Sequence, residues 1–394
     1  MKRLQIMTRS PQYPKAWLTH AQARQREMLT LLQALVEIES PSDHKAGVDH
    51  ASQLVASWMR VLGGRVRWHR QKNFGDLLEL RFAGQKSRGL RPVLLLGHLD
   101  TVWPLGTLAK MPFRKRAGKI FGPGVYDMKA GVVMAVTALR LLREAGVPTP
   151  PVIVLLNSDE EVGSPCSRAI TEKLAQECSA VFVLEPSQGP QGAYKTARKG
   201  VGEYRLQVEG VAAHSGVDFE QGHSAIVELA GLIERVAGFT NLKTGLTVNP
   251  GVIAGGTRVN VIAAKASVEV DIRIARKQDA ARVERMFRSL RVRDKLCRLQ
   301  VTGGLNRPPM ERTSGTVQLF KQAQALAAEM GFSLAEASTG GGSDGNFTAA
   351  LGIPTLDGMG AVGEGAHAAH ESVEVEQLPY RTALLAAMLA GRIE

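Results

Sequence analysis

The chain has 394 residues, 44% of them hydrophobic and 22% charged, and its net charge is +12. This composition excludes a disordered chain, and the length suggests two or three domains of about 100–200 residues each. No run of about 18 apolar residues is present, so we expect no transmembrane helix, and no apolar segment marks a secretory signal. Three widely separated cysteines form no disulfide framework, which favours a reducing cytoplasm.

Basic residues are concentrated in two places. Six of them precede Glu27 with no acidic residue among them, which predicts a loose N-terminal arm. Arg282, Arg285 and Arg288 recur every three residues, as on the exposed face of a helix. No aromatic residues interleave with them for base stacking, so we expect no nucleic-acid partner, and a positive field that attracts anionic substrates instead.

The first half of the chain alternates helical patterns with short apolar runs bounded by Pro or Gly. Strands of four to six buried residues that alternate with helices are typical of a mostly parallel sheet covered on both faces. We expect helices at about 21–38, 46–62 and 128–144, and strands at 91–97, 151–156 and 180–184.

The pattern changes near Gly200, where polar and apolar residues alternate as in half-exposed antiparallel strands. The predicted order there is β-α-β-β-α-β, which is typical of the split βαβ sandwich. After about residue 312 the sequence pattern is again mostly helical, and the last predicted helix covers 378–393. We therefore predict a small domain at 201–311 inserted into a larger one formed by 1–200 and 312–394. The inserted elements are expected at 203–209, 224–237, 247–254, 266–274, 278–290 and 296–302.

Polar residues that follow the predicted parallel strands are candidates for chemistry, because ligands bind beyond the carboxyl ends of such strands. A single Asp or His is more often a helix cap or a packed side chain, but five segments bring such residues to one edge. Imidazole and carboxylate ligands without cysteine suit a hydrolytic metal site, in which one Asp between two ions makes a two-metal clamp. The segments contain His98 and Asp100, Asp127, Asp159–Glu161, Glu185, and His367–Glu371.

In this order and spacing, the motifs GHLDTV, GPGVYDMKAG, DEEVGS, LEPS and HAAHE resemble those of the dizinc amidohydrolases and metallopeptidases. This family includes glutamate carboxypeptidases of the carboxypeptidase G type, acetylornithine deacetylase and succinyl-diaminopimelate desuccinylase. The resemblance implies a zinc-exopeptidase-like α/β fold, with a catalytic domain at 1–200 and 312–394. The inserted ferredoxin-like domain at 201–311 would be a lid that forms a homodimer.

The resemblance also implies a ligand set for two Zn²⁺ ions. His98 and Glu185 would hold one ion, Glu161 and His367 the other, and Asp127 would bridge them. Co²⁺ or Mn²⁺ would suit these ligands nearly as well. In the last motif the family places a glutamate four residues after the ligand, which fits His367 and leaves His370 as the alternative.

Two further residues of these motifs have implied roles. Asp100 would accept the second ring N–H of His98 and so fix its tautomer. Glu160 would be the general base that takes a proton from water and delivers it to the leaving amine. Adjacent residues that leave a strand point in different directions, so Glu161 can bind metal while Glu160 faces the water.

In the lid, the resemblance assigns His214 to oxyanion stabilisation in the partner subunit's active site. It assigns Arg273 to the α-carboxylate of the substrate, which a guanidinium can bind through two hydrogen bonds. Asn260 and Arg258 are further substrate-binding candidates. The alternative for each is a loop or surface residue that contacts no ligand.

The segment from Thr339 to Gly345 is rich in glycine but lacks the lysine of a phosphate-binding P-loop. We interpret it as a substrate-lining turn with close backbone approach at Gly342. Its three glycines before Ser-Asp are most similar to the glutamate carboxypeptidase branch. Lys195, Arg198 and Lys199 are candidates either for substrate binding or for solvated surface charges, and we expect them to be solvated.

The sequence therefore predicts a metal-dependent hydrolase that acts on a small acidic or acylated amino-acid or peptide substrate. Release of a C-terminal amino acid, glutamate first, is the preferred hypothesis. An N-acyl amino acid deacylase similar to acetylornithine deacetylase is the alternative. A catalytically silent binding protein on the same scaffold would lack a ligand or the base, and none of these residues is missing.

Overall fold

The computed structural model describes residues 12–85 and 89–391 of the chain. The chain divides into two compact units. The first contains the residues up to Thr196 together with 312–338 and those from Ser343 onward, and the second contains 197–311 and 339–342. The assignment of these units as a catalytic domain and a dimerisation lid stays a prediction.

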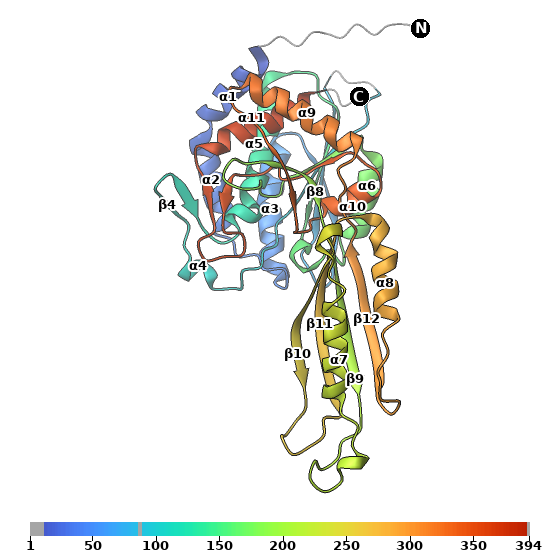
Figure 1. Cartoon of the computed structure of the whole chain (residues 1–394). Helices are drawn as coiled ribbons and strands as arrows, with labels where there is room; N and C mark the ends of the chain where they lie inside the picture. Colours follow the sequence, from blue (N-terminus) through green and yellow to red (C-terminus); the bar gives the residue numbers. More distant parts are fainter. Residues whose placement is uncertain (1–11, 86–88, 392–394) are drawn as a thin grey trace, which may run out of the picture. The chain divides into compact units, whose positions relative to one another are not determined.

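A six-stranded sheet forms the centre of the first unit, in the order β1-β2-β6-β3-β7-β14 (Figure 1). Strands β6, β3, β7 and β14 run parallel, whereas β1 and β2 pair antiparallel at one edge. The predicted mostly parallel sheet is thus confirmed. The strands are β1 (Arg65–His69), β2 (Leu77–Phe82), β3 (Val93–His98), β6 (Val152–Asn157), β7 (Ala180–Val183) and β14 (Thr355–Leu356).

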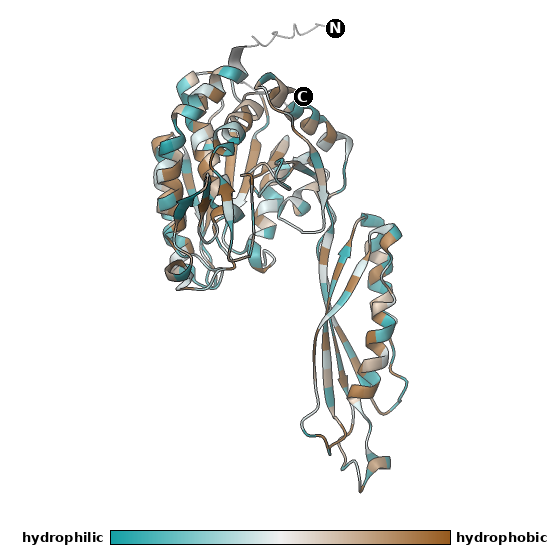
Figure 2. Cartoon of the chain, turned by 60° about the vertical axis from the view of Figure 1, so that its left-hand side comes forward, coloured by the Kyte–Doolittle hydropathy of each residue, from teal (hydrophilic) through white to brown (hydrophobic). Residues whose placement is uncertain are grey.

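Both faces of this sheet are covered, and Figure 2 shows hydrophobic residues along its strands. On β3, Val93 and Leu95 belong to the larger core cluster, and Leu94 and Leu96 belong to a second one. Successive residues of a strand point to opposite faces, which explains the continuous apolar run. The second cluster includes residues of α6 (Arg168–Glu177), which packs beside α10 (Gly345–Ala350). The larger cluster includes residues of α1 (Gln12–Ala23), α2 (Gln25–Val36), α3 (Lys45–Val61), α5 (Ala130–Ala145), α9 (Ser314–Glu329) and α11 (Gln377–Ala390).

The N-terminal segment differs from the expectation. Residues 12–23 form α1, whose Trp17 and Ala21 are buried in the core, so the predicted loose arm is wrong there. Residues 1–11 lie outside the described part. The helix expected at 21–38 is instead the end of α1 followed by α2, with a break at Arg24.

Helix α5 approaches the end of β7 closely at Gly131. A Cβ atom there would lie 2.2 Å from the carbonyl oxygen of Leu184, so no side chain fits. This contact places the turn Val125–Lys129, which leads into α5, near the segment that continues to Glu185. Further elements among the described residues are α4 (Thr107–Lys110), β4 (Arg114–Arg116), β5 (Lys119–Phe121), β8 (Tyr194–Arg198), β13 (Glu336–Thr339), β15 (Gly363–Glu364) and β16 (Ser372–Glu374).

The second unit is a four-stranded antiparallel sheet in the order β10-β11-β9-β12 (Figure 1). Helices α7 and α8 cover one face, where Leu206, Val268 and Phe287 form part of the core. The predicted β-α-β-β-α-β order is confirmed. The elements are β9 (Gly200–Glu209), α7 (Ala225–Ala237), β10 (Thr247–Gly255), β11 (Lys265–Ile274), α8 (Ala280–Arg288) and β12 (Arg298–Arg307).

Two features relate to the expected location. None of the helices in the described residues is long and apolar enough to span a membrane. Cys166, Cys178 and Cys297 are all free thiols. The cytoplasmic location stays a prediction.

Candidate metal centre

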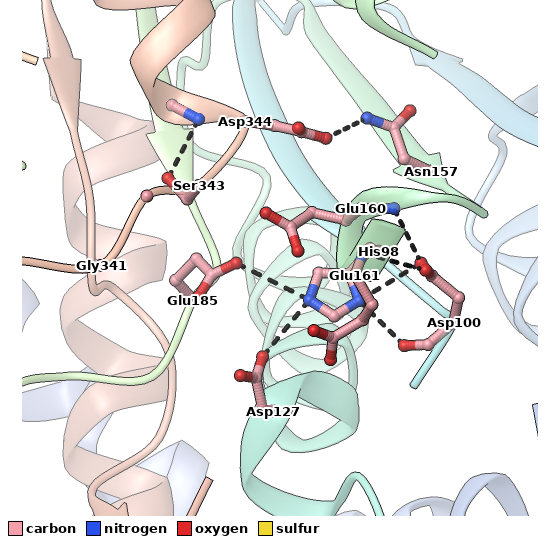
Figure 3. A network of polar contacts seen from close by, with 12 residues as sticks. His98, Asp100, Asp127, Asn157, Glu160, Glu161, Glu185, Gly341, Ser343 and Asp344 are labelled. Carbon is pink, nitrogen blue, oxygen red and sulfur yellow. Dashed lines mark hydrogen bonds and ion pairs between the residues drawn. The ribbon is translucent and has the colours of Figure 1, made fainter. Parts of the chain in front are cut away.

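Three strand ends and one turn bring four of the predicted metal ligands together (Figure 3). His98 is the last residue of β3, and Glu185 lies two residues beyond β7. The short helical turn Glu160–Val162 follows β6, and Asp127 lies in the turn before α5. The carboxyl ends of parallel strands meet at one edge of a sheet, so local sequence and topology together produce this cluster.

The ring of His98 is buried and held by its Nδ1 atom. Nδ1 lies 2.9 Å from the main-chain oxygen of Asp100 and 3.5 Å from its carboxylate Oδ1. The nearer acceptor is therefore the main-chain carbonyl, rather than the carboxylate that the sequence suggested. When Nδ1–H donates to that carbonyl, Nε2 faces two carboxylates: Oδ1 of Asp127 at 3.3 Å and Oε1 of Glu185 at 3.6 Å.

A second histidine faces the other side of Asp127. Nε2 of His367 lies 3.4 Å from Oδ2 of Asp127 and 3.2 Å from Oε2 of Glu161. His367 has a φ of +62°, a left-handed conformation that costs an ordinary residue about 1–2 kcal/mol. Asp127 thus presents one oxygen to each histidine. His370 is exposed and lies against Gly365 instead.

The separations of these donor atoms test whether metal ions fit. Ligand atoms at about 2.0–2.2 Å from a tetrahedral zinc ion lie roughly 3.3–3.6 Å from one another. The four distances from the two histidines to their carboxylates are 3.2–3.6 Å. Donor atoms of His98, Asp127 and Glu161 all lie within 4.8 Å of one another, as do those of His98, Glu160 and Glu185. Both the spacing and the donor types suit two divalent ions that share Asp127.

The pKa shifts of the cluster reflect its crowded negative charge. Burial raises the pKa of Glu161 to about 7. Hydrogen bonds to Asp127 and Glu161 raise the pKa of His367 to about 10. Burial opposes the charge on His98, but hydrogen bonds to Asp100, Asp127 and Glu185 still raise its pKa well above the ordinary value. The carboxylates of this cluster thus favour positive charge at both histidines.

The carboxylate of Asp100 supports the turn that carries the two glutamates. It accepts hydrogen bonds from the main-chain N–H groups of Glu160, at 3.3 Å, and Glu161, at 3.1 Å. The hydroxyl of Ser42 donates a third bond at 2.7 Å. Asp100 therefore fixes the directions in which the candidate base and its neighbouring ligand leave β6.

The sequence did not reveal Asp344 as a second support for this turn. Its buried carboxylate accepts a bond of 2.6 Å from Nδ2 of Asn157, at the end of β6, and another from the hydroxyl of Ser164 (Figure 3). The hydroxyl of Ser343 donates to Asp357 at 2.5 Å. The end of the glycine-rich run is therefore buried scaffold of the first unit. A Ser-Asp pair before a helix is the only local signal, and it does not identify these remote partners.

The candidates in the second unit form two groups. The main-chain N–H of Ser215, next to His214, donates to the carbonyl of Asn260 at 3.1 Å, and His214 pairs with Val261. The exposed Arg258 lies in the same loop region. These loops follow the ends of β9 and β10.

The other group lies at the opposite end of this sheet. Arg273 pairs with Val201 at the start of β9, and a Cβ at Gly342 would lie 2.7 Å from the Val201 side chain. The guanidinium of Arg273 binds the carboxylate of Asp271 through Nε and Nη2. Its Nη1 lies 3.5 Å from the carbonyl oxygen of Gly340.

The expectation of solvated basic residues near 195–199 is wrong for two of them. Lys195 and Arg198 are buried. Arg198 donates to the carbonyl oxygens of Gly341, at 3.2 Å, and Gly342, at 3.0 Å. Remote main-chain acceptors thus allow this charge to be buried.

Comparison with known proteins agrees with the site. Residues 94–391 match the sequence model of the peptidase family M20/M25/M40. The chain belongs to this family. It is 31% identical to carboxypeptidase G2 of Pseudomonas sp. strain RS-16 over 373 residues, which cover 93% of this chain and 89% of that protein. The family and the predicted resemblance agree, and the chain is a hydrolytic metallopeptidase of the M20 type.

Solved structures share the fold across nearly the whole chain. Aminopeptidase PepT from Bacillus cereus matches with a TM-score of 0.78 and 22% identity, covering 93% of this chain and 98% of that one. The Bacillus subtilis protein YxeP, a dinuclear metal-binding peptidase of the M20 family, matches with a TM-score of 0.69 and 16% identity over 94% and 98% of the two chains.

The choice between the two terminal histidines can be tested by metal content. We expect His367→Ala to lose about one of two bound ions per chain, because it removes the imidazole that lies 3.2 Å from Glu161 and 3.4 Å from Oδ2 of Asp127. His370→Ala is the matched control and should retain both ions. Elemental analysis of the purified variants after dialysis measures this. Loss of an ion from His370→Ala alone would reverse the assignment.

Proposed function

We propose that this chain hydrolyses an amide bond and releases a C-terminal amino acid, most specifically glutamate. The observation that carries the proposal is the pair of donor sets that share Asp127 at the end of a parallel sheet. Similarity to carboxypeptidase G2 over 93% of the chain supports the carboxypeptidase branch.

In this proposal His98 and Glu185 hold one ion, Glu161 and His367 hold the other, and Asp127 bridges the two sets. Zinc matches the donor types, and cobalt or manganese are chemically close substitutes. If two divalent ions were bound by these residues, they would supply a water molecule of lowered pKa and a Lewis acid for the scissile carbonyl.

Glu160 is the proposed general base. It shares the turn with Glu161, its N–H donates to the carboxylate of Asp100, and its donor oxygen lies within 4.8 Å of donor atoms of His98 and Glu185. It therefore stands beside the ligands. Its carboxylate takes a proton from the attacking water and passes it to the leaving nitrogen.

The base assignment predicts a separation of catalysis from metal binding. Glu160→Gln should lower kcat by about 10²–10⁴-fold, since an amide accepts no proton at neutral pH. The variant should keep the wild-type metal content, which Glu161→Gln, its neighbour in the same turn, should not. Steady-state kinetics and elemental analysis of both variants decide this. A Glu160→Gln enzyme with near wild-type turnover would disprove the role.

The choice of glutamate rests on charge and on the branch similarity. The chain is basic overall, and Arg273 offers a guanidinium whose orientation is fixed by Asp271. We propose that Arg273 binds the substrate α-carboxylate, with Arg258, Asn260 and the backbone at Gly342 as further substrate contacts.

A substrate panel tests this choice. We expect an aroyl-glutamate to be hydrolysed at least ten-fold faster, in kcat/KM, than acetyl-ornithine or other N-acetyl amino acids. A chelator should abolish the activity, and added zinc or cobalt should restore it. Faster turnover of the N-acetyl compounds would favour the deacylase alternative. Bound metal with no turnover of any amide would favour a silent binding protein.

The second unit supports a homodimer. In β9, Val201 pairs with Arg273 and Glu209 pairs with Lys265, and the eight residue steps from Val201 to Glu209 span about 26 Å. His214 lies beyond Glu209, so Arg273 and His214 of one subunit cannot contact the same small substrate. We therefore propose that His214 stabilises the oxyanion in the partner subunit's active site.

An apolar surface on this unit suits the dimer contact. Val227 on α7 and Ile253 on the edge strand β10 are 70% and 64% exposed. A Cβ at Gly255 would lie 3.2 Å from Ile226, so the helix and the edge strand adjoin. Such an edge is a template for pairing with another chain.

Sedimentation can test the assembly. The wild type should sediment as a dimer, and Val227→Glu combined with Ile253→Glu should produce monomers with strongly reduced kcat but intact metal content. Leu296→Glu, which places a charge on an exposed leucine elsewhere in this unit, is the control. A fully active monomer would contradict both the dimer and the role of His214.

A further inference from the structure

Glu371 is completely buried, and both of its carboxylate oxygens are used. Oε1 accepts bonds from the main-chain N–H groups of Tyr126, at 2.8 Å, and Asp127, at 3.0 Å. Oε2 accepts from the indole N–H of Trp103, at 2.7 Å, and the main-chain N–H of Gly124, at 3.0 Å. A carboxylate has about four acceptor positions, so each donor has its own.

These donors come from segments that carry metal ligands. Trp103 lies in the loop between β3, which ends at His98, and α4, and the residues from Gly124 to Asp127 lie in the turn before α5. Glu371 itself lies four residues after His367, in a turn closed by the bond from its own N–H to the carbonyl of Ala368, at 2.8 Å. One carboxylate thus connects three ligand-bearing segments that are far apart in the sequence.

We propose that Glu371 is a positioning residue for the two-metal site, an inference that rests on the proposed function. By holding the N–H groups of Tyr126 and Asp127, it fixes the main chain from which the bridging carboxylate extends. The same contact keeps the His367 turn beside that carboxylate. Without it, the two oxygens of Asp127 would no longer be directed at both donor sets.

The chemistry requires an anion with two acceptor oxygens. Glutamine has nearly the same shape but only one acceptor oxygen, and its amide nitrogen would face two N–H donors. Two buried N–H groups would then lose their partners, which is unfavourable in a dry environment. Glu371→Gln therefore disturbs the hydrogen bonds with little change in side-chain volume.

Zinc titration against a competing chelator tests the proposal. We expect Glu371→Gln to bind at least one of the two ions 10–100-fold more weakly than the wild type. At saturating zinc its kcat should fall about ten-fold or more with KM changed less than two-fold, because substrate contacts remain. Glu374→Gln is the control, since Glu374 lies three residues away on β16 and pairs only with Lys119 at 3.1 Å among the described residues. Wild-type affinities for both ions in Glu371→Gln would overturn the proposal.

A second measurement does not depend on the variant folding or on activity. In the metal-free wild type, amide hydrogens of Gly124, Tyr126 and Asp127 should exchange with solvent at least 100-fold more slowly than those of the exposed loop around Val259. Free exchange of these three amides would overturn the proposal. If the wild type binds no metal, the proposed function fails, and this exchange experiment still decides whether Glu371 holds the turn.

Discussion

The repulsion among four carboxylates in a small space is the constraint on which the rest of the structure depends. Two unit charges 4 Å apart repel by about 4 kcal/mol at an effective dielectric constant of 20, and Asp127, Glu160, Glu161 and Glu185 converge around His98. No flexible chain would keep such groups together. The fold does so by placing them on three anchored segments: the turn after β6, which carries both Glu160 and Glu161, the end of β7, and the turn before α5. Bound cations would relieve this repulsion. The arrangement of the carboxylates therefore favours cation binding before any other chemistry of the site.

The anchoring itself uses further carboxylates. Three carboxylates lie outside the proposed ligand set: those of Asp100, Asp344 and Glu371. Each accepts hydrogen bonds from a segment that contains or adjoins a proposed metal ligand. An anion suits this task because it accepts several N–H bonds at once, whereas an amide or hydroxyl accepts fewer. These supports also add negative charge around the site and so strengthen its attraction for divalent ions. Rigidity and metal affinity therefore have the same structural origin, and a substitution in one of these supports alters both.

The sequence predicts those parts of the fold that depend on local patterns. Strands β3, β6 and β7 are short apolar runs because both faces of the sheet are covered, and the candidate ligands follow them directly. Helix α1 was missed because only a few of its residues, among them Trp17 and Ala21, reach the core. The burial of Arg198 and the partners of Asp344 depend on which remote segments meet, and no local pattern encodes that. For the same reason the sequence predicts a substrate-lining turn for the whole glycine-rich run, whereas Ser343 and Asp344 at its end are buried supports.

The second unit places its candidate residues too far apart to serve one small ligand within one subunit. Strand β9 is continuous from the pairing partner of Arg273 to the loop that carries His214, and a strand of this length cannot fold back on itself. If both residues act on substrate, they must act in different active sites of an assembly. Because the edge strand β10 and the adjoining face of α7 expose apolar side chains, the surface needed for that assembly belongs to the same unit. Catalytic metal binding would then be complete in a single chain, whereas stabilisation of the transition state would require two.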